Sequence, residues 1–332
     1  MSAQIGIDLG NSSFKAIRTN GNKVEAIGLV VNPVGKIVAE TDAEMVKLAE
    51  TMKKLMTEVG MTAGQAKITL TDSLTYSRVI SMPVLSNAEV ASAIHWEAEQ
   101  YIPMPLEEVE LSFDVLSRPD KKTGQERMDV FLLACPKKVI ASVLNMCARV
   151  GLEPTIIETE MVSAARAMIA KKILMGASMI CVCGASSVTL GLFKGDVLTF
   201  VYRLSGGGMA MTRAISTTLQ LSMSQAETYK HSYGAAGNVL EGKLAAAMAP
   251  VLNGMIDEMK RAQSYYQQQV VGGKIEKIIL CGGVALMPGL VQLLTDRLGA
   301  EVVLGDALAG MEVGAAWKRL APVFAGAVGV VS

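Results

Sequence analysis

Residues 5–17, IGIDLGNSSFKAI, constrain this chain more than any other stretch. They read as an alternating apolar strand, a short turn of glycine, asparagine and serine, and a second strand that carries Lys15. A turn of this composition presents backbone N–H groups to an anion. Because a carboxylate repels a phosphate unless a metal ion lies between them, Asp8 predicts a hydrated Mg²⁺, and Lys15 predicts a direct phosphate contact. An ordinary polar hairpin is the alternative that these residues alone leave open.

Composition limits what this hairpin can belong to. The length of 332 residues predicts two domains or more, and a hydrophobic fraction of 51% favours sheets buried on both faces. No apolar run reaches the length of a transmembrane helix, and the N-terminus has no signal-peptide pattern. Lys plus Arg equals Asp plus Glu at 31 each, so nucleic acid is not an expected partner. Five cysteines in mostly apolar segments predict buried thiols and a cytoplasmic globular protein.

The chain continues as helices and strands. A one-face apolar period predicts a helix over 42–59, and a strand is expected over 67–71. Residues 76–150 read as strand, helix, two strands and helix, with a capping box of Ser86 and Glu89 before the first helix. This α+β insert has no clustered catalytic or metal-ligating residues, so an interaction module is its preferred role.

The opening pattern returns in residues 179–193, MICVCGASSVTLGLF. The turn residues of the two hairpins correspond one by one: Gly184 to Gly10, Ser186 to Ser12 and Ser187 to Ser13. Two copies of one phosphate-binding hairpin predict two related lobes that face one nucleotide across a cleft. A coincidence between two short strand pairs is the alternative.

Two further glycine motifs follow the second hairpin. Gly206, Gly207 and Gly208 precede a helix expected to start near Ala210, where a helix N-terminus favours a phosphate. Residues 278–283, IILCGG, read as a buried strand that ends in paired glycines, which suit the flat face of a base or ribose.

The order of these motifs carries a resemblance. The chain resembles the actin/Hsp70/sugar-kinase ATPase superfamily in the order of its motifs, which is hairpin, insert, hairpin, GGG-helix, AE-x-x-K and GG-x-x-x-x-P-G. In detail it resembles the type IV pilus assembly PilM family, which is related to the division protein FtsA. The most specific stretch lies in residues 93–116, where IHWEAEQYIPMPLEEVELSFDVL resembles the family signature W-E-x-E-Q-Y-I-P-x-P-x-E-E-V. The resemblance covers essentially the whole chain, with further matches at 156–168, 221–230, 259–268 and 323–329.

The resemblance implies an α/β, actin-like (ribonuclease H-like) two-lobed ATPase fold with an FtsA-type small insert domain. Lobe one would comprise residues 1–75, 155–171 and 316–332. The insert would comprise 76–154. Lobe two would comprise 172–315, with 221–274 as its upper subdomain.

The resemblance also implies a nucleotide site for ATP or ADP with Mg²⁺. Asp8 would hold the metal through water, Gly206 to Gly208 would cover the phosphates, Glu227 and Lys230 would reach the ribose and base, and the paired glycines would pack on the adenosine. The implied nucleotide-binding residues are Asp8, Gly10, Asn11, Ser12, Ser13, Lys15, Gly184, Ser186, Gly206, Gly207, Gly208, Glu227, Lys230, Gly282 and Gly283.

The chain departs from the family pattern in its second hairpin. Family members usually read D-x-G there, whereas this chain reads Val182-Cys183-Gly184. Loss of one preorganised electrostatic group can cost about 2.7–4 kcal/mol of transition-state stabilisation. Glu158 stands where the family often has aspartate and is the candidate for orienting water. We therefore expect nucleotide binding with slow or absent hydrolysis.

The family resemblance implies a protein partner, the cytoplasmic N-terminal tail of the inner-membrane protein PilN, bound as an added extended segment. Candidate contacts are Trp96, Tyr101, Pro103 and Pro105, although core packing explains Trp96 and Tyr101 equally well. The implied role is an adaptor of the pilus assembly platform, attached to the inner membrane only through its partner. Alternatives are an active actin-like ATPase, an FtsA-like filament and a type II secretion component. Pilus motor ATPases and further copies of the chain are open as partners.

Overall fold

Two five-stranded sheets form the centre of the protein. The computed structural model describes residues 3–119, 126–236, 239–270 and 273–332. The first sheet has the order β3-β2-β1-β4-β8. Its strands are β1 (Gln4–Leu9), β2 (Ser13–Asn20), β3 (Lys23–Val31), β4 (Gly64–Leu70) and β8 (Leu152–Thr159).

The second sheet repeats the topology of the first. Its order is β11-β10-β9-β12-β13. In both sheets an antiparallel three-strand meander is extended by two parallel strands on the side of its first strand. The internal repeat predicted from the two hairpins is therefore confirmed at the level of whole sheets. The strands are β9 (Ala177–Cys183), β10 (Ser187–Lys194), β11 (Val197–Ser205), β12 (Lys277–Cys281) and β13 (Glu301–Leu304).

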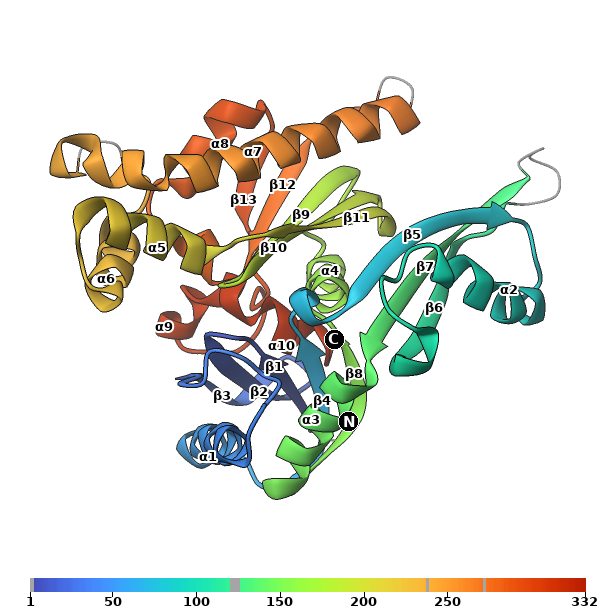
Figure 1. Cartoon of the computed structure of the whole chain (residues 1–332), viewed down its shortest axis with the longest axis horizontal. Helices are drawn as coiled ribbons and strands as arrows, with labels where there is room; N and C mark the ends of the chain where they lie inside the picture. Colours follow the sequence, from blue (N-terminus) through green and yellow to red (C-terminus); the bar gives the residue numbers. More distant parts are fainter. Residues whose placement is uncertain (1–2, 120–125, 237–238, 271–272) are drawn as a thin grey trace.

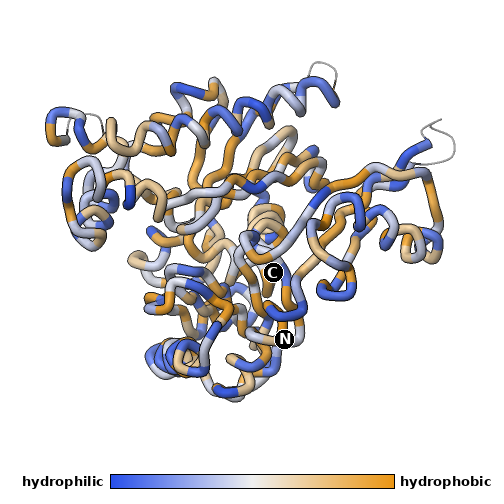
Figure 2. Tube along the Cα trace, in the orientation of Figure 1, coloured by the Kyte–Doolittle hydropathy of each residue, from blue (hydrophilic) through white to orange (hydrophobic). Residues whose placement is uncertain are grey.

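Helices cover the outer faces of both sheets. Thr41 caps the N-terminus of α1 (Asp42–Glu58), whose apolar face is buried against the first sheet. The second sheet is covered by α5 (Gly208–Leu219), α6 (Met223–Tyr233), α7 (Lys243–Gln269) and α8 (Leu290–Leu298). Figure 2 shows hydrophilic and hydrophobic residues alternating along α7, and no described helix is long and apolar enough to cross a membrane. The remaining short helices are η1 (Asp72–Leu74), η2 (Leu106–Glu108), η4 (Val239–Gly242), η5 (Gly283–Leu286), α9 (Ala315–Lys318) and η6 (Ala321–Phe324).

Two helices lie between the sheets and connect them. α4 (Glu160–Ala170) packs against α10 (Ala325–Gly329) (Figure 1). One apolar core includes residues of both helices and both sheets. A Cβ atom at Gly329 would lie 1.7 Å from the carbonyl oxygen of Ser163, so this crossing requires glycine. The cleft between the sheets is lined by the tips of the two hairpins, among other residues.

The insert is a three-stranded sheet covered by one helix. Its order is β5-β7-β6, with β5 (Tyr76–Pro83), β6 (Val109–Ser117), β7 (Arg127–Pro136) and α2 (Asn87–Glu99). The predicted capping box is present, because Ser86 and Glu89 exchange side-chain and backbone hydrogen bonds. Figure 1 shows this sheet projecting to one side of the two central sheets.

The helix that follows the insert sheet packs differently from the sequence-based division. The sequence placed α3 (Lys137–Arg149) within the insert, but its buried residues Val139, Val143 and Met146 share one core with α1 and the first sheet. Its amphipathic face therefore packs mainly against α1 and β8 of the first sheet's side, and it also contacts β7 of the insert sheet. The other domain boundaries stay predictions.

Candidate functional site

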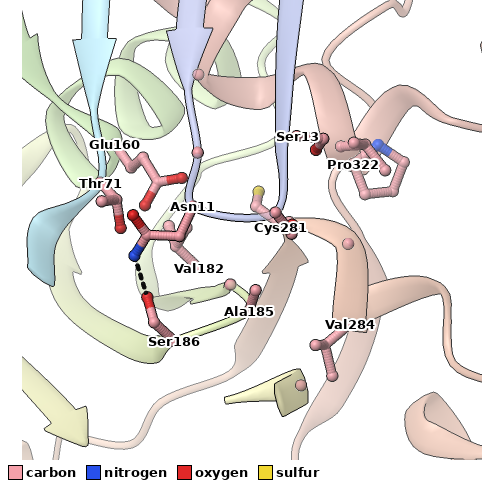
Figure 3. A pocket seen from close by; sticks show the side chains of 18 of the residues that line it. Asn11, Ser13, Thr71, Glu160, Val182, Ala185, Ser186, Cys281, Val284 and Pro322 are labelled. Atoms are coloured by element: carbon pink, nitrogen blue, oxygen red, sulfur yellow. Dashed lines mark hydrogen bonds between the residues drawn. The ribbon is translucent and has the colours of Figure 1, made fainter. Parts of the chain in front are cut away.

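The candidate site is a cleft between the two central sheets (Figure 3). Both hairpin tips, the start of α4 and the residues after β12 line it. Among the predicted nucleotide-binding residues, those that line the cleft are Asp8, Gly10, Asn11, Ser12, Ser13, Lys15, Gly184, Ser186, Gly208, Glu227, Lys230, Gly282 and Gly283. Gly206, Gly207 and Glu158 are not among its lining residues.

The two hairpins have the same turn. The Gly10 N–H donates to the Ser13 carbonyl oxygen at 3.1 Å, and the Gly184 N–H donates to the Ser187 carbonyl oxygen at 3.0 Å. A Cβ at Gly10 would lie 2.8 Å from that Ser13 oxygen, which explains the glycine. The tips also touch each other across the cleft.

The contact between the tips is a hydrogen bond. Asn11 Nδ2 donates to Ser186 Oγ at 2.8 Å, and Figure 3 marks this bond. The Oδ1 atom of Asn11 is buried and has no hydrogen-bond partner among the described residues. A polar atom left in this state is suited to accept a donor from a ligand.

Asp8 and Lys15 form a buried ion pair at the base of the first hairpin. They are opposite each other in the register of β1 and β2, and Lys15 Nζ lies 3.1 Å from Asp8 Oδ2. Burial raises the pKa of the Asp8 carboxyl group, and the Lys15 charge opposes this rise. The second carboxylate oxygen, Oδ1, is buried without a hydrogen-bond partner among the described residues.

The second hairpin carries no such pair. Val182 and Thr189 occupy the equivalent register positions on β9 and β10. Val182 lines the cleft, so the departure from the family pattern lies at the site itself. Thr189, opposite Val182, occupies the position of Lys15, and the one-by-one correspondence of the two hairpins is the sequence signal that could have identified it.

Glu160, and not Glu158, is the acidic residue of the connecting segment that lines the cleft. Glu158 forms a bidentate ion pair with Arg166, with two N–O distances of 2.7 Å, and accepts a hydrogen bond from Ser163. Glu160 is the first residue of α4, just past the carboxyl end of β8, where ligands of α/β sheets commonly bind. That position was the signal that could have identified it.

Several carboxylates surround Glu160. Burial, followed by the charges of Asp8 and Asp72, raises the pKa of Glu160 to about 8. Asp72 is itself buried, which raises its pKa to about 6. Lys15 is the one cation among the causes of the Glu160 shift. This end of the cleft therefore crowds carboxyl groups around the ammonium group of Lys15, which favours their protonated forms.

The glycine motif before α5 is hydrogen-bonded to the turn of the second hairpin. The N–H groups of Gly206, Gly208 and Met209 donate to carbonyl oxygens in the turn of the second hairpin, at distances of 2.8–3.2 Å. A Cβ at Gly207 would lie 2.4 Å from the Gly184 carbonyl oxygen. These three amides are used within the protein, and of the three glycines only Gly208 lines the cleft, so phosphate cover by Gly206 and Gly207 stays a prediction.

Glu227 and Lys230 form a compact polar cluster on the lobe-two side. Lys230 Nζ lies 2.7 Å from Glu227 Oε2 and donates to the Gly208 carbonyl oxygen at 3.0 Å. Burial favours the neutral form of Glu227, but hydrogen bonds from His231, Lys230 and Thr212 outweigh it and lower its pKa to about 2. Glu227 is therefore an anion at neutral pH that faces the cleft beside a buried lysine.

The paired glycines after β12 give the cleft a flat wall. Gly282 has φ +86°, and a Cβ there would lie 2.4 Å from the Cys183 carbonyl oxygen. Nothing lies within 4 Å of a Cβ at Gly283. A planar group could approach the backbone closely at this point.

The candidate partner-binding residues lie outside the cleft. Trp96, Tyr101, Pro103 and Pro105 are all exposed on the insert, with Trp96 at 74% exposure. The alternative of core packing is wrong for Trp96. Tyr101 lies under the Arg78 guanidinium group, which is 4.3 Å from the ring centre.

Two sheets of one topology that face a common cleft through matching hairpins define a protein with the actin-like ATPase fold. The family model described as type IV pilus assembly protein PilM matches residues 6–330. The chain belongs to this family.

Solved structures agree with the family and the fold. The chain matches a PilM-PilN type IV pilus biogenesis complex with a TM-score of 0.84 and 26% identity, over 98% of this chain and 97% of that chain. It also matches EutJ of Carboxydothermus hydrogenoformans (TM-score 0.61, 14% identity, 99% and 89% covered) and MreB 5 of Spiroplasma citri bound to AMPPNP (0.55, 13%, 98% and 95%). The last two show the fold alone.

A curated relative is the cell division protein FtsA of Streptococcus pneumoniae. It is 26% identical over 141 residues, which cover 36% of this chain and 30% of FtsA. The chain thus aligns with less than a third of that protein.

Proposed function

We propose that this chain is a nucleotide-binding adaptor of the type IV pilus assembly platform, which docks the cytoplasmic tail of a PilN-like inner-membrane protein and hydrolyses ATP slowly or not at all. The observation that carries the proposal is the asymmetry of the cleft: one hairpin keeps a charged pair, Asp8 and Lys15, and the other has Val182 and Thr189. Membership of the PilM family supports the pilus role.

The first hairpin has what a nucleotide phosphate needs. Lys15 would donate to a phosphate oxygen, and the backbone of the Gly10–Ser13 turn lines the same space. Among the described residues no group of three or more His, Cys, Asp or Glu could hold a metal ion by itself. The unpartnered Oδ1 of Asp8 fits a contact to a metal-bound water instead. Mg²⁺, when bound, would neutralise phosphate charge.

The lobe-two side has the groups for the rest of the nucleotide. The Glu227 carboxylate can accept hydrogen bonds from ribose hydroxyls, since hydrogen bonds keep it ionised. Gly282 and Gly283 offer an open backbone surface for the base. The cleft therefore suits ATP or ADP by chemistry as well as by fold.

The chemistry for hydrolysis is incomplete. Val182 supplies no charge where a carboxylate would order the attacking water. The raised pKa of Glu160, about 8, leaves this group mainly protonated at pH 7, so it is a poor proton acceptor. Slow turnover follows from both features, and Glu158 stays a candidate only if it leaves its ion pair with Arg166.

Docking of a tail is supported by one neighbour and by exposed residues. The solved PilM-PilN complex matches the chain over nearly its whole length. The insert exposes Trp96 on α2, away from any core. Through such a partner the protein would be peripheral to the cytoplasmic face of the inner membrane.

Calorimetric titration of ATP, with and without Mg²⁺, tests the nucleotide half of the proposal. Wild type is expected to bind, and Asp8→Ala is expected to lose the gain in affinity that Mg²⁺ provides. Asp196→Ala, which removes an exposed carboxylate from the β10–β11 turn, is the matched control. If the wild type does not bind ATP, the cleft is vestigial and the nucleotide-binding part of the proposal is wrong.

A separate titration tests the docking half. A peptide with the sequence of a PilN-like N-terminal tail should change the emission of the exposed Trp96, or lose affinity when Trp96→Ala removes this side chain. A tail peptide that binds neither the wild type nor the nucleotide-bound protein would contradict the adaptor role and leave nucleotide binding standing.

A further inference from the structure

A second hollow lies between the insert and lobe two. It has a volume of about 510 Å³, and none of its lining residues lines the nucleotide cleft. Its walls are residues 76–79 of β5 and 200–203 of β11, with Tyr101 and Tyr265 beside them. We name these residues the aromatic groove.

Both strands of the aromatic groove are sheet edges. β5 is the outer strand of the insert sheet, and β11 is the outer strand of the lobe-two sheet. The two strands approach each other without pairing (Figure 1). An edge strand presents backbone N–H and C=O groups that an added strand can pair with. A further hollow of about 500 Å³ shares Tyr202 and Arg203, but it lies between β11 and helices α5 and α7 and is lined by Glu258, so it is not counted as part of the aromatic groove.

The side chains of the aromatic groove favour an acidic ligand. Arg78 stacks on Tyr101, and Phe200 stacks near Tyr265 with ring centres 4.6 Å apart. Arg78 and Arg203 are exposed, and neither forms an ion pair with a described carboxylate. None of the described residues that line the groove is Asp or Glu. The charge of Arg203 opposes the rise in the pKa of the buried Asp72, which does not line the groove, whereas Arg78 has no ion-pair partner among the described residues.

We propose that the aromatic groove binds an extended, acidic peptide segment of a protein partner, which pairs with the outer edge of β11 and places carboxylates against Arg78 and Arg203. Backbone pairing along an edge strand gives affinity without sequence, and the arginines and rings select charge and side-chain shape. The inference goes beyond nucleotide binding and does not depend on it, because the groove and the cleft share no residue.

Fluorescence anisotropy with defined peptides tests this inference. The probe is a labelled seven-residue peptide of alternating Glu and Val, and its counterpart has Lys in place of Glu. We expect the Glu peptide to bind about tenfold tighter than the Lys peptide, and less tightly as salt concentration rises. The double variant Arg78→Ala/Arg203→Ala should weaken it about tenfold. Arg213→Ala, at an exposed arginine of α5, should leave it unchanged.

Two further probes keep the test decisive. Tyr202→Ala removes an exposed ring of the groove without touching a charge, and should also weaken binding. Two further versions of the peptide are N-methylated on alternate residues, so that each lacks the backbone N–H donors along one of its two edges. At least one of these versions should lose binding. Each of three results would overturn the proposal. The Glu peptide does not bind, the Glu and Lys peptides bind equally, or both methylated versions bind as well as the unmodified peptide. Asp8→Ala should not change this binding, which separates the result from the nucleotide site.

Discussion

The two hairpins that face the cleft have kept one backbone and separated in chemistry. Gly10 and Gly184 close their turns with hydrogen bonds of nearly the same length, and the flanking strands have the same register. Asp8 and Lys15 face the cleft in one hairpin, whereas Val182 lines it in the other. One backbone geometry therefore carries two different sets of side chains at the cleft. In the proposed function, that difference separates binding a nucleotide from acting on it.

The largest expected effect is a difference in ATP affinity between substitutions in the charged hairpin and in the uncharged one. Lys15→Met should lower ATP affinity by about 2–3 kcal/mol, because it removes a charge-assisted contact to phosphate. Thr189→Val, at the equivalent position of the second hairpin, should change affinity little. Calorimetry on both variants checks this. Equal losses would mean that the two hairpins contribute alike and would break the comparison.

The pH dependence of stability should reveal the crowded carboxylates beside the first hairpin. Between about pH 4.5 and pH 8, native Glu160 holds a proton that the unfolded chain has released, because its pKa is raised to about 8. The native state binds more protons, so the free energy of unfolding falls as pH rises through this window.

Glu160→Gln should remove this part of the pH dependence. We expect the variant to be more stable than wild type at pH 8, on the order of 2 kcal/mol, and similar at pH 4.5. Urea unfolding at the two pH values measures the difference. A variant that is less stable than wild type at pH 8 would contradict the raised pKa of Glu160.

The two turn glycines should differ in their tolerance of a methyl group. A Cβ at Gly10 would lie 2.8 Å from the Ser13 carbonyl oxygen, against 3.1 Å from the Ser187 oxygen for Gly184. Gly10→Ala should therefore cost about 1–2 kcal/mol of stability, and Gly184→Ala less. Thermal unfolding of both variants checks the order. The reverse order would show that the two turns relax differently.

The smallest expected effect concerns the contact between the tips. Asn11→Ala and Ser186→Ala should each cost about 0.5–1 kcal/mol, because they remove one exposed hydrogen bond of 2.8 Å. A double-mutant cycle by urea unfolding should give a similar coupling energy. Zero coupling would mean that the tips do not hold each other in solution.

The sequence predicted the fold through its repeats. Short hairpins with glycine turns can be recognised locally, because their register and turn chemistry depend on neighbouring residues. The packing of α3 against α1 and the first sheet could not be predicted, since a one-face apolar period shows that a helix is buried but not against which sheet.

The sequence predicted the cleft less completely. Glu158 and Glu160 lie two residues apart, and only the structure shows that Arg166 engages the first while the second lines the cleft. The glycines before α5 read as a phosphate cradle, but the N–H groups of Gly206 and Gly208 bond to the second hairpin. Contacts between segments distant in sequence decide both cases, and local patterns do not contain them. The aromatic groove was missed for the same reason, because β5 and β11 are far apart in the chain.

Single-turnover hydrolysis of ATP by Val182→Asp is the most direct test of the central claim. Val182→Asn, which has a similar shape but no charge, is the control, and ATP binding is measured on each variant. The account predicts slow hydrolysis by wild type and by Val182→Asn, and an increase of about tenfold or more in Val182→Asp. Rapid hydrolysis by wild type, or no increase in a Val182→Asp protein that binds ATP normally, would contradict it.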